Sequence, residues 1–136
     1  MKDPTFEIRK YYIDALQPVL DVQVVNYATA GVEPPYVLVM TRAEYEGTMT
    51  TRLWIMTTEI TIVVKAGGDF GGDAMTEKYS EMILERLFQS DTYGATANFD
   101  IITQLVRNIE TDYEVLQDGR LLLKKIQIEN YVEQKN

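Results

Sequence analysis

The chain has 136 residues, 46% of them hydrophobic, a formal net charge of −8, and neither cysteine nor histidine. Without these two residue types it cannot form disulfides, thiolate or imidazole metal sites, or a triad that uses histidine as the base. The negative charge disfavours nucleic-acid binding as the main role, because such binding gains from cationic side chains that release counterions. The length and apolar content fit one domain, residues 1–136, with a single core.

The first predicted element is a helix that opens at Asp3 and Pro4. Asp3 can accept hydrogen bonds from free backbone N–H groups, and Pro4 fits the first helical position. Pro18 is expected to end the helix near Leu16. The N-terminal residues carry acids and no long apolar run, so we expect no secretory signal. Apolar residues at spacings of three and four define the buried side, namely Ile8, Tyr12, Ala15, Leu16 and Val19.

Two short strands are predicted next. Residues 21–27, DVQVVNY, have the composition of a first strand, and residues 36–40, YVLVM, form a second that is almost wholly apolar. Residues 28–35 between them are rich in turn formers. Pro34 and Pro35 are expected to lie outside the second strand, because proline cannot donate a hydrogen bond to a ladder.

Residues 41–50, TRAEYEGTMT, are polar, which predicts a hairpin loop that projects beyond the sheet. Such a tip can be plainly solvated. A projecting loop that carries tyrosine and arginine is also typical of a contact with a partner. Both interpretations remain open at this point. The candidate interface residues are Arg42, Glu44, Tyr45 and Glu46.

Residues 51–65, TRLWIMTTEITIVVK, predict the central strand of the sheet. Apolar residues of one parity face one side of a sheet, and we expect Trp54 and Ile62 on the core side. This run is longer than its expected neighbour, residues 36–40, so we also expect part of its ladder to need another subunit. The residues of this parity are Trp54, Met56, Ile60, Ile62 and Val64.

A glycine-rich break, residues 66–73, separates this strand from a second predicted helix, residues 74–89. The break lacks the GK[ST] motif of a phosphate-binding loop, and Asp69 and Asp73 would repel an anion. Its DFG tripeptide lacks the other kinase motifs. The simpler interpretation is a turn with Asp73 as helix cap. The apolar side of the helix comprises Met75, Tyr79, Met82, Ile83 and Leu87.

The C-terminal part predicts a long hairpin. Residues 99–116 and 120–132 read as strands, and Asp118-Gly119 between them is a strong signal for a two-residue turn. With those two residues as the turn, the predicted cross-strand pairs are Val115 with Leu122, Ile109 with Ile128, and Asp112 with Lys125.

The resulting fold class is α+β, with an antiparallel or mixed β-sheet of about five strands and two helices packed on one face. No apolar run approaches the roughly 20 residues of a membrane span. Acidic pairs such as Glu44 with Glu46, or Asp112 with Glu114, could act as an acid–base couple. Such pairs are common among 21 acidic residues, so we expect no catalytic residues, metal site or cofactor.

The order of these patterns resembles the tail-completion or tail-terminator proteins of long-tailed bacteriophages. The resemblance rests on DALQPVL, PPYVLVM, TRLWIMTTEITIVVK with the glycine break after it, EKYSEMILERL, and the run from IITQLVRNIE to QIENYV. It covers nearly the whole chain and is one of order and pattern.

This resemblance implies a structural role in the virion. Proteins of that family form a ring, typically hexameric, that caps the head-proximal end of the tail tube and joins it to the neck. The implied partners are other copies of the chain, the tail tube protein and a neck or head-completion protein. DNA would pass through the ring without specific binding, and the protein would occupy the host cytoplasm before assembly. The alternatives are a head-closure or neck connector protein, or a small non-enzymatic α+β ligand-binding domain.

Overall fold

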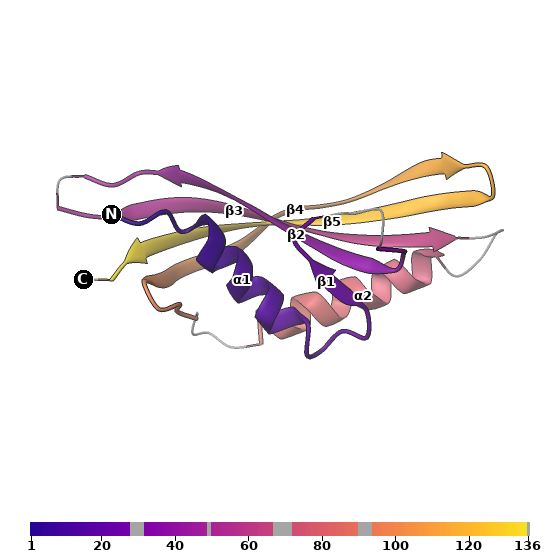
Figure 1. The fold of residues 1–136 in the computed structure, drawn as a ribbon, viewed down its shortest axis with the longest axis horizontal. Coiled ribbons are helices and arrows are strands. Elements are labelled where there is room, and N and C mark those ends of the chain that lie inside the picture. The colour runs from indigo at the N-terminus through magenta and orange to yellow at the C-terminus, as the bar shows by residue number, and fades with distance from the viewer. Residues whose placement is uncertain (28–31, 49, 67–71, 90–93, 136) are drawn as a thin grey trace.

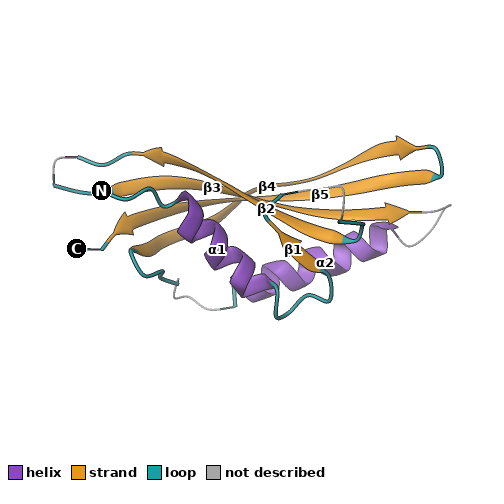
Figure 2. Ribbon diagram, viewed as in Figure 1, coloured by secondary structure: helices purple, strands orange, loops and turns teal. Residues whose placement is uncertain are grey.

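The computed structural model describes residues 1–27, 32–48, 50–66, 72–89 and 94–135. A five-stranded mixed sheet has the strand order β1-β2-β3-β5-β4, and both helices lie on one of its faces (Figures 1 and 2). This arrangement confirms the predicted α+β class. The elements are α1 (Thr5–Leu16), β1 (Gln23–Val25), β2 (Tyr36–Tyr45), β3 (Leu53–Ala66), α2 (Gly72–Leu87), β4 (Phe99–Leu116) and β5 (Gly119–Gln134).

Helix α1 begins and ends where the sequence predicts. The Asp3 carboxylate accepts a hydrogen bond from the Thr5 backbone N–H at 2.9 Å, and α1 ends at Leu16, two residues before Pro18. The first strand is shorter than predicted, since β1 holds three residues, and it pairs parallel with β2. Neither described helix is long and apolar enough to cross a membrane.

Strand β3 is the centre of the sheet and is paired on both sides. Strand β2 pairs antiparallel with residues 54–63, and β5 pairs antiparallel with residues 53–66. The expectation that the long strand leaves part of its ladder for another subunit is therefore wrong for residues 54–63, and among the described residues only β5 pairs with residues 64–66.

The reason is that β2 continues through Tyr45, so residues 41–45 are strand and not loop. The Thr41 hydroxyl donates to the Thr5 carbonyl at 2.9 Å, and Ala43 packs against the core. Tertiary contacts thus hold a polar run in the sheet, overriding its weak local preference.

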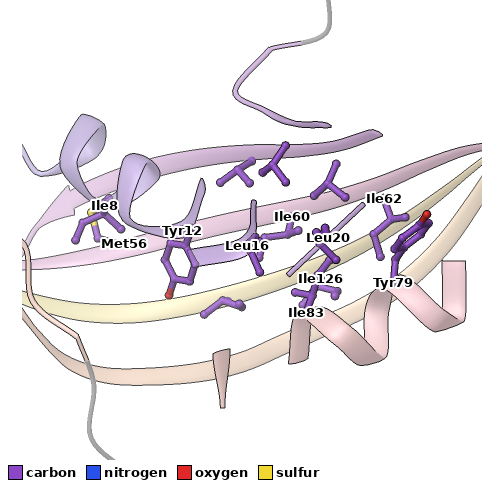
Figure 3. Packing of buried hydrophobic residues seen from close by; sticks show 14 of the residues in the cluster. Ile8, Tyr12, Leu16, Leu20, Met56, Ile60, Ile62, Tyr79, Ile83 and Ile126 are labelled. Atoms are coloured by element: carbon purple, nitrogen blue, oxygen red, sulfur yellow. The ribbon is translucent and has the colours of Figure 1, made fainter. Parts of the chain in front are cut away.

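The core lies between the helices and one face of the sheet (Figure 3). Ile62 is fully buried, and Trp54 is partly buried against the same cluster, so the predicted side of β3 is confirmed. Residues from both helices complete the core, with Ile8, Tyr12 and Leu16 of α1 and Tyr79 and Ile83 of α2 among them.

The buried side of α2 differs from the prediction at its beginning. Thr76 and Ser80 are buried, whereas Met75 is exposed. The Thr76 hydroxyl donates to the Asp73 carbonyl at 2.9 Å, which satisfies it inside the protein. Since α2 begins at Gly72, Asp73 lies in the first turn and is not the helix cap. The rest of the glycine-rich break, residues 67–71, falls outside the described residues.

The C-terminal hairpin is confirmed, but its register is shifted by two residues. The turn is formed by Gln117 and Asp118, and Leu116 pairs with Gly119, whose φ of 149° is open mainly to glycine. From the turn to Asn108 the shift of two keeps the paired residues on their predicted sides, because side chains alternate with a period of two. Beyond Asn108 the irregularities of β4 change the register further. The observed pairs are Val115 with Arg120, Ile109 with Ile126, Asp112 with Leu123, and Glu110 with Lys125.

Replacing Ile62 by alanine should lower the free energy of unfolding by about 2–4 kcal/mol, because a fully buried side chain is lost and a cavity remains. Chemical denaturation followed through the single tryptophan measures the change. Val115→Ala is the matched control, since Val115 is 80% exposed and the expected loss is below about 1 kcal/mol. An unaltered unfolding midpoint for Ile62→Ala would contradict the core assignment.

Cysteines at positions 112 and 123 should form a disulfide, whereas cysteines at 112 and 125 should not. Directly opposed residues hold their Cβ atoms about 4.5–5.5 Å apart, against roughly 7–8 Å for diagonal neighbours, and a disulfide requires about 3.5–4.5 Å. The chain has no native cysteine to compete. Preferential oxidation of the 112–125 pair, seen by mass spectrometry, would restore the register predicted from the sequence.

Candidate interaction surface

Two of the four predicted interface residues lie together on β2. Arg42 pairs with Thr57 and Glu44 with Ile55. Side chains alternate along a strand and Ala43 packs against the core, so these four side chains are on the opposite face of the sheet. Arg42 and Glu44 are exposed. Arg42 borders two hollows of about 460 and 270 Å³, and Glu44 borders the smaller of them. Met40, Thr57, Glu59 and Gln127 also line the larger one.

The other two predicted residues, Tyr45 and Glu46, lie at the end of β2 and do not join Arg42 and Glu44. Tyr45 has the opposite parity to Arg42 and packs edge-on against Trp54, with ring centroids 4.9 Å apart. The Glu46 backbone N–H donates to the Leu53 carbonyl at 2.9 Å, which closes the hairpin. The structure therefore brings Arg42 and Glu44 together and separates both from Tyr45.

A second surface, which the sequence prediction missed, lies along β4. Six large hydrophobic side chains on this one strand have exposed fractions from 39% to 80%. Their sequence pattern predicts a strand but not its position at the edge of the sheet, where fewer neighbours cover the side chains. They are Ile102, Leu105, Val106, Ile109, Tyr113 and Val115.

The outer side of β4 is paired only at its beginning, within the part of the chain that the structure describes. The Ile101 N–H donates to the Gly94 carbonyl at 3.1 Å, and Ala95 forms a bridge with Asp100. From Ile102 onward no described residue pairs with this side. The strand is also irregular, with register shifts between Ile101 and Thr103 and between Val106 and Asn108. A long edge of this kind offers unpaired backbone groups to another chain.

A buried polar cluster fixes the irregular part of β4 to the rest of the fold. The Tyr12 hydroxyl lies 2.7 Å from Gln104 Oε1 and 2.9 Å from Asn130 Oδ1, so it can donate to either. The Gln104 amide donates to the Leu87 carbonyl at 2.8 Å, and the Asn130 amide to the Thr103 carbonyl at 3.2 Å. Burial raises the pKa of Tyr12, which keeps this donor protonated. The cluster joins α1, the end of α2, β4 and β5.

Glu7 holds the turn that leads into β4. Its carboxylate accepts hydrogen bonds from the Thr96 hydroxyl at 2.6 Å, from the Asn98 backbone N–H at 3.2 Å, and from the Asn98 side-chain amide. Burial opposes ionisation of Glu7, but these hydrogen bonds outweigh it and hold the pKa of the carboxyl below its usual value. Glu7 is thus a structural carboxylate.

One candidate for a small-ligand site is a cleft of about 530 Å³ between α1, α2 and residues 95–97. Its polar lining is largely engaged within the chain, since Glu7 binds residues 96 and 98 and Lys10 pairs with Asp14. Among the described residues no group of three or more histidine, cysteine or acidic side chains is placed to hold a metal ion. The exposed strand edge is therefore the surface that the geometry favours for an interaction.

Similarity to known proteins is found at the level of the fold. No protein-family model matches the chain, and no curated protein matches it. Among solved structures, the chain is similar to a chain from the virion of a native gene transfer agent particle, with a TM-score of 0.69 and 12% sequence identity. The similarity covers 95% of both chains, so it includes the whole architecture and not one hairpin.

Glu7→Gln should destabilise the protein at neutral pH and have less effect in acid. A carboxyl with a lowered folded-state pKa contributes stability that is present above its ordinary value, 4.5, and lost as the pH falls through the folded-state pKa. The unfolding curves of the wild type and the variant should therefore converge below that pH. Glu81→Gln, on the exposed side of α2, is the matched control. A difference that stays constant with pH would contradict the proposed role of Glu7.

Proposed function

We propose that this chain is a structural subunit of a phage-type virion, and specifically a tail-completion protein. The observation that supports this most is its similarity to a gene transfer agent virion chain over 95% of both chains. The order of sequence patterns supports the same role independently, because it resembles the tail-terminator family from the N-terminal helix to the last hairpin.

In this proposal the subunits form a closed ring, most simply a hexamer, at the head-proximal end of the tail tube. One side of the ring would contact the tube protein and the other a neck protein. Identical subunits that use two different surfaces form a ring when the rotation between them closes. The two edges of the five-stranded sheet are two such surfaces on one subunit.

The charge of the chain suits a ring through which DNA passes. Each subunit carries a formal net charge of −8, and a negatively charged channel does not bind the phosphate backbone. The same charge makes free subunits repel one another, which favours assembly on the tube end over assembly in solution. The proposed location is therefore the virion, after a period in the host cytoplasm.

The proposal includes no enzymatic activity. Asp3, which is exposed, and Glu7, which is partly buried, have lowered pKa values because their carboxylates accept hydrogen bonds from backbone and hydroxyl groups of the fold. Glu7 lines the cleft of about 530 Å³, but Thr96 and Asn98 occupy its carboxylate, whereas a catalytic group is placed beside a second reactive group. The lowered pKa values of these two carboxylates thus have structural explanations.

Antibody labelling of purified particles should place the protein at the junction between head and tail, with the copy number of a hexamer. Negative-stain images locate the label, and quantitative mass spectrometry against the tube protein gives the copy number. Cross-links to the portal side and none to the tube would favour the head-closure alternative. A single copy per particle, or a label at the far end of the tail, would contradict the ring.

A further inference from the structure

The sheet presents two edges at which another chain can add a strand. One is β4 from Ile102 onward. The other is β2 beyond Leu38, because β1 pairs only with residues 36–38 and no other described residue pairs with the outer side of residues 39–45. These edges lie on opposite sides of the same sheet, separated by β3 and β5.

The two edges lie at the same height along the strands. The registers connect Arg42 through Thr57 and Glu129 to Leu105. In the same way they connect Val39 to Ile109 and Glu44 to Thr103. Residues 39–44 are thus level with residues 103–109, and Tyr45 is level with Ile101. A copy placed beside another without a shift along the strands would bring these two segments together. Such heterologous contacts form a ring when the rotation between copies closes.

The direction of the two strands and the sheet faces of their side chains are also compatible with this contact. Successive pairs from β2 to β3, β5 and β4 are all antiparallel, so β4 runs opposite to β2. A neighbour in the same orientation would therefore add its β4 as an antiparallel strand. Leu105 and Arg42 lie on the same sheet face in each copy, so the joined sheet would keep its helix-covered and open faces continuous.

The side chains of the two segments suit contact between copies of an acidic chain. Residues 101–109 contain one arginine and no acid, and residues 39–45 contain one arginine and one glutamate. The acids of β4 lie outside this segment, at Asp100, Glu110, Asp112 and Glu114. Exposed apolar side chains occur on both edges, with Met40 at 52% and Leu105 at 46%. This part of the surface is where repulsion between two copies is small and apolar area is available.

The second irregularity of β4 lies close to the limit of the free edge of β2. The shift falls between Val106, which is level with Thr41, and Asn108, which is level with Met40. Glu110 is level with Leu38, where β1 begins to cover β2, so a strand added to β2 must leave it within two residues after Asn108. A bulge bends a strand, and β4 has one just before this point.

We propose that the segment from Ile102 to Ile109 on β4 of one subunit pairs antiparallel with residues 39–45 on β2 of the next. The contact is heterologous and repeats around the ring. In this contact Arg42 and Glu44 belong to the β2 segment to which β4 of the neighbouring subunit is added. This inference rests on the proposed function only in that it supplies the contact by which the proposed ring closes.

Disulfide trapping tests the pairing, because the chain has no native cysteine. Positions 42 and 105 are three strand spacings apart within one subunit, about 14 Å, which is too far for an internal disulfide. Oxidation of the Arg42→Cys/Leu105→Cys double variant in assembled particles, or at high protein concentration and high salt, should give a ladder of covalent oligomers. The ladder should end at the ring size. Glu81→Cys/Leu105→Cys is the matched control and should give none.

A second variant tests the contact without a cross-link. Leu105→Lys would face Arg42 of the neighbour, and it should abolish incorporation into particles while the free subunit keeps its unfolding midpoint. Val115→Lys makes the same change, from an exposed apolar side chain to lysine, on β4 outside the contact and should still be incorporated.

Disulfide dimers of Leu105→Cys alone would overturn the pairing, since they would show β4 against β4. Rings in particles without a 42–105 bond would overturn it too, and they would leave the proposed function intact. A 42–105 ladder from a protein absent from particles would support the pairing and contradict the proposed function.

Discussion

The fold depends on continuous backbone pairing through β3. This strand has a full-length ladder with β5 and a ladder with β2 over residues 54–63. One of its faces supplies the centre of the core, including the fully buried Met56, Ile60 and Ile62. Because β3 is satisfied on both sides, the backbone groups that remain for other chains lie at the edges of the sheet. The position of the interaction surface follows from the strand order.

The two edges are built differently. Strand β4 is long and irregular and carries six exposed large apolar side chains, and the buried Tyr12, Gln104 and Asn130 cluster holds its irregular part in place. The free part of β2 is short and ends where β1 begins. Soluble proteins commonly protect an edge with charge or a cover. The apolar part of β4 has no cover among the described residues, and its one charged side chain, Arg107, is paired with Glu129 of the same sheet. This is the property expected of an edge that is paired in an assembly.

The local signals in the sequence predicted most of the helices and strands and the side of each that faces the core. Proline at position 18 ended α1, alternation in β3 placed Ile62 in the core, and the Asp118-Gly119 dipeptide located the hairpin. The wrong predictions concern features that depend on tertiary structure, which local sequence signals do not encode. The extension of β2 depends on contacts of Thr41 and Ala43 with α1 and the core. The exposure of Leu105 and Ile109 depends on which strand lies at the edge, and a run of valine, leucine and isoleucine reads the same in a central strand.

Hydrogen–deuterium exchange of the free subunit and of the assembled particle tests the central claim most directly, that assembly uses the two strand edges. Unpaired edge amides exchange readily, and pairing with a neighbour protects them. The account predicts that protection on assembly is gained in residues 39–45 and 102–109 and that β3, already paired on both sides, changes little. Protection gained mainly on α1 and α2, with both edges still exchanging freely, would contradict it.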